Sequence, residues 1–203
     1  SIFVIESFGK VLVNANDALH SYPEKVIETF VNEISNRWPT IDYLFCGHGS
    51  ASYYPNSIHC PGKEDMEVAK TREQFFLHNF CKITKVLKAK ISIPFAAGFA
   101  LLKDEIRWIN NSRYEVSEIQ NYYINHFGKE ENVQKMLPGD ILRNGEIHAL
   151  SNYHSKIIDG SLNHLIEEEY GDEIKEINKI RFINMSEKEF FVKNIYKNIS
   201  KRA

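Results

Sequence analysis

Two amphipathic helices separated by short apolar strands are the sequence feature that most constrains this fold. Residues 24–37 and 64–88 both repeat apolar side chains at helical spacing. A short apolar run at 41–47 lies between them, and another at 91–99 follows the second helix. An order of strand, helix, strand, helix, strand predicts a layered α/β fold in which the helices pack on a sheet.

The chain opens with two further strand candidates, residues 2–6 and 11–14, joined around residues 8–10. Their spacing predicts a hairpin that belongs to the same sheet. Because the first strand begins at residue 2 without a preceding segment, we expect these residues to be part of a longer protein.

The second half of the chain has weaker signals. Residues 115–128 have the pattern of a helix, and residues 133–142 that of a strand with a Pro-Gly turn. From about residue 150 the sequence is polar, rich in Lys and Glu, and helical in pattern. We therefore predict an α/β domain over 1–148 and a helical extension over 149–203.

Composition narrows the kind of partner that this chain can have. Of its 203 residues 43% are hydrophobic, which is enough for a sizeable core. The 25 basic and 27 acidic residues give a net charge of -2. A balance of this kind gives no electrostatic reason to expect nucleic acid or a membrane as partner, so neither is expected.

The cysteines are sparse and odd in number, which does not fit a disulfide framework. We expect reduced thiols, a reducing compartment and hence a cytoplasmic protein. A zinc set and a thiol nucleophile beside an imidazole are the other two interpretations. The spacing fits no standard zinc pattern, so we expect no structural zinc. The zinc set would be Cys46, His48, His59 and Cys60, and the nucleophile would be Cys46 or Cys60; Cys81 is the third cysteine.

Polar and small residues gather where three predicted strands end, in "NAND" (14–17), "CGHGSASYYP" (46–55) and "PFAAGF" (94–99). Functional residues in α/β folds collect at such junctions. Asp17 has two interpretations, a turn residue or a metal ligand or catalytic acid at a strand end. The loop 46–55 is either a flexible connection or a segment that lets a ligand approach the backbone closely.

Four segments in order resemble one family. "GKVLVNANDA" resembles the metallo-β-lactamase-fold strand that ends in a metal-bridging Asp, here Asp17. "IDYLFCGHGSASYYP" and "IPFAAGF…WINNS", with "MLPGDIL" after them, resemble the later half of the branch that contains CMP-N-acetylneuraminic acid hydroxylase. The likeness covers roughly residues 2–145. It implies a four-layer αβ/βα sandwich, of which this chain supplies the second half.

The resemblance implies a metal-dependent hydrolase or oxygenase that acts on a small molecule, with zinc or iron as the metal. Asp17 would be a metal ligand, and His20 and His48 are the nearby candidates to join it. The substrate pocket would be lined by Gly49, Ser50, Ser52, Tyr53 and Tyr54.

The family's His-x-His-x-Asp-His motif does not occur in these residues. We therefore expect an incomplete site that binds metal weakly, to be completed by a missing N-terminal half or a partner subunit. Half a sandwich should also expose an apolar sheet face. The alternatives are a non-catalytic α/β binding or assembly module that has lost the metal site, and an unrelated small regulatory domain.

Overall fold

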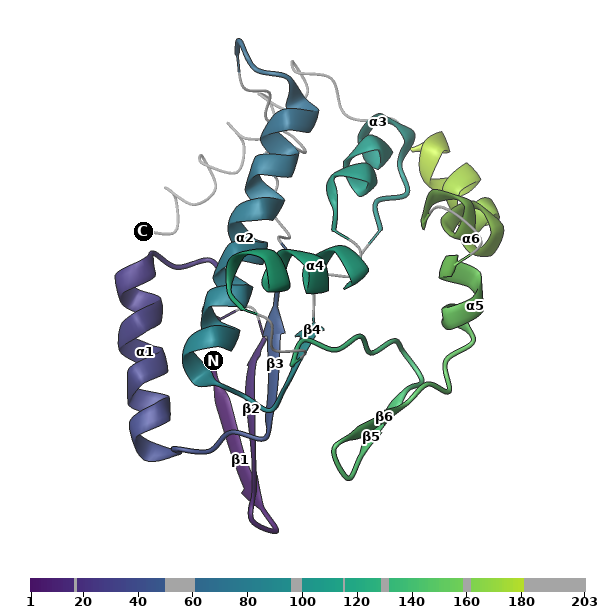
Figure 1. The fold of residues 1–203 in the computed structure, drawn as a ribbon. Coiled ribbons are helices and arrows are strands. Elements are labelled where there is room, and N and C mark those ends of the chain that lie inside the picture. Colours follow the sequence, from purple (N-terminus) through teal and green to yellow (C-terminus); the bar gives the residue numbers. More distant parts are fainter. Residues whose placement is uncertain are drawn as a thin grey trace, which may run out of the picture.

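A mixed four-stranded sheet organises this α/β chain (Figure 1). The computed structural model describes residues 1–16, 18–49, 61–95, 100–114, 116–128, 132–158 and 162–180. The strand order is β1-β2-β3-β4, with β1 antiparallel to β2 and the later neighbours parallel. The strands are β1 (Phe3–Ser7), β2 (Lys10–Asn16), β3 (Tyr43–Gly47) and β4 (Ile91–Phe95). The predicted hairpin and single sheet are confirmed, whereas residues 96–99 lie outside the described residues.

The two predicted amphipathic helices cover one face of this sheet. They are α1 (Glu24–Arg37) and α2 (Asp65–Leu87), which contact each other. Each one connects a strand to its parallel neighbour, and such crossovers are right-handed. Because β2, β3 and β4 follow one another in a single direction across the sheet, both crossovers return over the same face. In Figure 1 the sheet accordingly lies behind α2, with α1 beside it.

The core lies between these helices and the covered face of the sheet. Val13 of β2 and Leu44 of β3 are fully buried there, together with Val31 of α1 and Phe80 of α2. The predicted apolar face of α2 is correct at Phe80, whereas Phe76 is only half-buried. Burial of this interlocked set is what holds the helices on the sheet.

The opposite face of the sheet, here called the open face, keeps apolar side chains in solvent. Alternation along the strands sends Phe3 and Ile5 of β1 and Phe95 of β4 to this face, where they are 62%, 55% and 38% exposed. The half-buried Leu12, Tyr43 and Phe45 lie on the same face. The expectation of an exposed apolar sheet face is therefore confirmed in part, because Ile91 and Ile93 of β4, which lie on the same face, are buried.

Asp42 ties together the amino ends of β2, β3 and β4. Its buried carboxylate accepts hydrogen bonds from Lys90 Nζ (2.8 Å), Val11 N (3.0 Å) and Lys10 Nζ (3.2 Å). The Lys90 bond is the largest influence, and together these donors lower the pKa of Asp42 to about 2 against the opposing effect of burial. Asp42 therefore stabilises the amino ends of these strands and takes no part in the structure at their carboxyl ends.

The second half of the chain continues from β4 through short helices and a small hairpin. The elements are α3 (Asp104–Arg107), η1 (Trp108–Ser112), α4 (Val116–His126), β5 (Ile141–Arg143), β6 (Glu146–His148), α5 (Tyr153–Ile158) and α6 (Leu162–Lys179). The predicted helix at 115–128 and the helical pattern after 150 are confirmed as far as residue 180. In Figure 1, β5, β6, α5 and α6 lie to the side of the main sheet. No helix among the described residues is long and apolar enough to cross a membrane.

The predicted strand over 133–142 is wrong for most of its length, although the turn predicted within it at Pro138-Gly139 is confirmed. Val133 makes one isolated parallel bridge to Ser92, and regular pairing resumes only at Ile141. Asp140 explains the interruption, because its side chain accepts Leu137 N at 2.7 Å while its own backbone N–H donates to Leu137 O at 2.9 Å. A closed turn of this kind removes Leu137 and Asp140 from any ladder.

Candidate functional site

The carboxyl ends of β2 and β3 meet at a kink in the sheet. Asn14 pairs with Phe45 and Asn16 with Cys46, so the extra residue Ala15 forms a bulge. Asn16 has a positive φ of 46°, and its N–H donates to Asn14 Oδ1 at 3.1 Å. The two asparagines of "NAND" therefore shape the turn itself. Asp17, the residue on which the metal interpretation depends, lies outside the described residues.

His20 is buried beneath the loop that follows β3. It is 4% exposed, and its Nε2–H donates to the backbone oxygen of Gly49 at 2.9 Å. Because a carbonyl oxygen only accepts, this bond fixes the tautomer that has the lone pair on Nδ1. Asn79 of α2 donates from Nδ2 to His20 O at 2.7 Å, and the Phe76 ring lies edge-on at 5.2 Å. His20 thus connects the β2 exit, the β3 exit and α2.

Gly47 provides the space that the His20 ring occupies. A Cβ built on Gly47 would lie 2.8 Å from His20 Cε1 and 2.9 Å from Asn16 O. Real Cβ atoms do not approach other atoms so closely, so no larger residue fits here without displacement. The glycine of the "CGHG" segment is therefore required by the packing between the two loops.

His48 follows Gly47 and stands next to the same cluster. Its ring centroid is 6.2 Å from that of Phe80, on the side of the sheet that α2 covers. Burial is the largest influence on the pKa of His48, and together with the nearby His20 and Arg113 it lowers this pKa to about 4. The imidazole is therefore neutral at pH 7. Its Nδ1 has no hydrogen-bond partner within the part of the chain that the structure describes.

The structure brings three of the predicted site residues together at this edge: His20, His48 and Gly49. The other predicted residues lie outside the described part of the chain, namely Asp17, Ser50, Ser52, Tyr53 and Tyr54. Their roles stay predictions.

A charged group beside this cluster was not predicted from the sequence. Glu73 of α2 is 3% exposed and pairs with Arg72 Nη2 at 2.8 Å. Arg113, at the end of η1, lies close enough to influence the pKa of His48. Burial lowers the pKa of Arg113, whereas Glu73 raises it. A signal was available, because Glu73 stands four residues after Ala69 and four before Leu77, in line with the buried stripe of α2.

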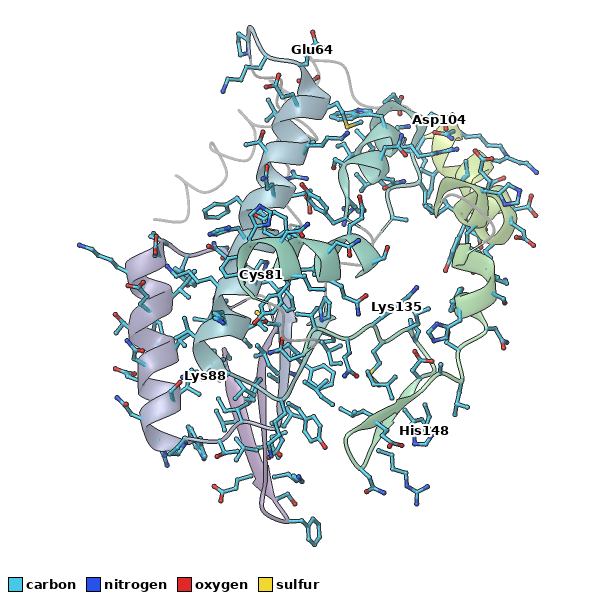
Figure 2. All side chains as sticks on the ribbon, in the orientation of Figure 1. Glu64, Cys81, Lys88, Asp104, Lys135 and His148 are labelled. Atoms are coloured by element: carbon cyan, nitrogen blue, oxygen red, sulfur yellow. The ribbon has the colours of Figure 1, made fainter. Side chains whose placement is uncertain are left out.

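The cysteines do not supply a nucleophile in the described part of the chain. Cys46 and Cys81 are both buried and free. Burial raises the pKa of the Cys46 thiol to about 12, and it raises the pKa of Cys81 as well. Figure 2 shows Cys81 in the interior, on the side of α2 that faces the sheet. Cys60 lies outside the described residues.

An imidazole–carboxylate contact lies away from the sheet edge. His154 Nε2 is 2.8 Å from Asp140 Oδ2, and the Asp140 side chain has no exposed surface. Asp140 also accepts the N–H groups of Leu137 and Ser151. These bonds pin the two ends of the segment that carries the β5–β6 hairpin, whose end is marked by His148 in Figure 2. The pair therefore has a structural explanation.

The cluster at the sheet edge has two features of a metal-ligand set. A ligating histidine commonly donates its other ring N–H to a backbone carbonyl, as His20 does to Gly49. His48 is held in the neutral form that binds metals. Two imidazoles are fewer than the three or four ligands of a usual zinc site, and the described residues contain no group of three His, Cys, Asp or Glu suited to a metal.

No protein-family model, curated protein or solved structure matches this chain.

Proposed function

We propose that this chain forms part of a metal-dependent hydrolase or oxygenase of the metallo-β-lactamase type that acts on a small molecule. The supporting observation is that His20, from the β2 exit, lies against Gly47 and bonds to Gly49, which are the two chain neighbours of His48 at the β3 exit, on the same edge of the sheet. Edges of this kind are where α/β folds place their ligands.

The hydrogen bond of His20 and the lowered pKa of His48 support this role. His20 has its tautomer fixed by Gly49 O, so that Nδ1 carries the lone pair. His48 is neutral above a pKa of about 4, so it needs no proton loss before it can bind a cation. Asp17, next to the bulge of β2, is proposed as the anionic member of the set.

A bound zinc or iron ion would supply an activated water or oxygen species. The residues of the chain have other tasks in this proposal. His20 and His48 hold the cation, Gly49 orients His20, and the loop that follows binds the substrate. The open face would receive the second αβ layer, from a longer chain or a partner subunit, which brings the missing ligands.

Zinc titration followed by NMR of the imidazole nitrogens tests this proposal. We expect weak binding that shifts the resonances of His20 and His48 and leaves those of the exposed His148 unchanged. His48→Gln should abolish the shifts at His20, whereas His148→Gln should not.

Two results would refute the metal proposal. One is a set of shifts spread equally over His148 and the edge histidines, which indicates adventitious binding. The other is a set of shifts that includes His20 and leaves His48 unchanged, because His48 is then not a ligand. In a longer or complemented form the affinity should rise sharply and should fall again with Asp17→Ala.

The open face supports a second candidate, a non-catalytic binding or assembly module. Phe3, Ile5 and Phe95 give this face an apolar surface that a stable monomer usually covers. A chain that shows no imidazole shifts with zinc but still associates through this face would favour the second candidate.

A further inference from the structure

We propose that two copies of this chain pair through the outer edge of β1, so that their sheets join into one continuous sheet across a twofold axis at Val4. This contact uses the edge of the sheet, whereas the proposed second layer would cover its open face. The proposal is therefore independent of the proposed function.

The outer edge of β1 has hydrogen-bonding groups that no other strand among the described residues uses. β1 is the terminal strand of the sheet, with β2 on its inner side. The hairpin turn has positive φ at Phe8 and Gly9, and Ser7 pairs with Lys10, as in a two-residue type I′ turn. In such a hairpin Ser7 and Lys10 exchange hydrogen bonds, and so does every second pair.

The register then decides which groups point outward. Ile5 pairs with Leu12 and Phe3 with Asn14, so these are the pairs that exchange hydrogen bonds within the sheet. The N–H and C=O groups of Val4 and Glu6 therefore point to the outer edge, as do those of Ile2. A second strand can bond to them.

An antiparallel copy of β1 fits this edge when it is centred on Val4. Val4 then faces Val4 of the second copy, and Ile2 faces Glu6, which makes about six hydrogen bonds between the copies. Phe3 faces Ile5 twice on the open face. No charged residue meets another of the same sign in this register, so the edge is complementary to itself.

The sheet is apolar on both faces next to this edge. An added strand places its side chains alternately on the two faces, so both must accept apolar groups. On the covered side a groove of about 440 Å³ lies between β1 and α1, with Val4, Phe30 and Ile34 in its lining. Phe30 is 45% exposed in this groove. It can receive Val4 and Ile2 of the second copy, while Phe3 and Ile5 lie on the opposite side.

The edge also lacks the usual devices that prevent strand pairing. Edge strands of monomers are protected by Lys, Pro or a bulge. β1 reads FVIES, with neither Lys nor Pro and with unbroken register to β2. Its acidic residue, Glu6, accepts a hydrogen bond from Trp38 Nε1 at 3.2 Å.

Sedimentation equilibrium on charge-pair variants tests this register. In Phe3→Lys/Ile5→Lys, like charges face each other across the twofold axis, so we expect a monomer. In Phe3→Glu/Ile5→Lys, the introduced carboxylate faces the introduced ammonium group of the second copy, so the dimer should persist and should weaken as salt is added. Both variants are equally polar on the open face, and circular dichroism checks that each one folds.

A third variant separates the edge from the face. Val4→Pro removes the N–H at the twofold axis, where Pro is tolerated because that N–H points to solvent, and it should give a monomer. A wild-type chain that stays monomeric at about 200 µM, where even weak pairs associate, overturns the proposal. So does a dimer that survives Val4→Pro, and so does equal loss of the dimer in both charge-pair variants, which would indicate packing of face against face.

Discussion

Substitution of Gly47 by Ala tests whether the His20 cluster is packed as tightly as its geometry indicates. The added methyl group would lie 2.8 Å from His20 Cε1 and 3.0 Å from Nδ1. It would also lie 2.9 Å from the backbone oxygen of Asn16, which cannot rotate away. The chain must therefore separate the β2 and β3 exits, move the imidazole, or do both.

The expected cost comes from three contributions to the free energy of unfolding. Overpacking of a filled site costs about 1–3 kcal/mol. Displacement of His20 breaks its bond to Gly49 O, which contributes about 1 kcal/mol. Loss of a glycine restricts the unfolded chain and returns about 0.4–1 kcal/mol. We expect a net loss of about 1–3.5 kcal/mol.

Urea denaturation at pH 7 measures this loss, with Gly171→Ala as the matched control. A Cβ on Gly171 would meet nothing within 4 Å, so the same chemical change should be neutral or slightly stabilising in α6. In a His20→Ala background the cost of Gly47→Ala should fall but not vanish, because the Asn16 oxygen stays in place. Equal midpoints for Gly47→Ala and Gly171→Ala would refute the packing argument.

Four further predictions concern pH, thiol reactivity and the core. Folding lowers the pKa of His48 from 6.5 to about 4, so the free energy of unfolding should fall by up to about 3 kcal/mol as pH drops from 6.5 to 4. His48→Gln should flatten that part of a profile of urea midpoint against pH. Folding lowers the pKa of Asp42 from 3.8 to about 2, so its carboxylate stabilises the fold above pH 4 and loses this effect toward pH 2. Asp42→Asn should lower the free energy of unfolding by about 1–2 kcal/mol at pH 7, measured by urea denaturation. Cys46 and Cys81 should react with a thiol reagent at pH 8 only after unfolding, and denatured protein should titrate as three free thiols. Phe80→Ala should cost about 3–5 kcal/mol by urea denaturation, and an unchanged midpoint would mean that the buried face of α2 is wrongly assigned.

The fold was predictable where local signals and packing agree. Pro23 precedes the first residue of α1 and Pro39 follows its last turn, so the predicted helix over 24–37 matches the observed one. The segment 133–142 was not predictable in the same way. Its apolar residues indicated a strand, but the side chain of Asp140 takes up backbone donors that a ladder would need. Periodicity carries no information about such a competitor.

The candidate site was predictable in its residue types and not in its arrangement. His20 and His48 stood out because they follow strands, but nothing local indicates that His20 bonds to Gly49, 29 residues away. That contact depends on the parallel pairing of β2 with β3. Glu73 was missed because α2 was interpreted from its apolar residues, although a carboxylate in line with its buried stripe requires a partner.

The open face and the free edge both follow from one property of the topology. Because the strands after β2 add in a single direction, every crossover helix covers the same face, and β1 stays at the end of the sheet. A second layer on the open face and a second copy on the β1 edge would therefore shield different atoms from solvent. A layer on the open face would cover the side chains of Phe3 and Ile5 and leave the outward N–H of Val4 in exchange with solvent. A copy on the edge would slow exchange at Val4 and Glu6 and leave Phe95, three strands away, as exposed as before. Amide exchange at β1 and solvent access at Phe95 therefore distinguish the two partners within one sample, even if both bind.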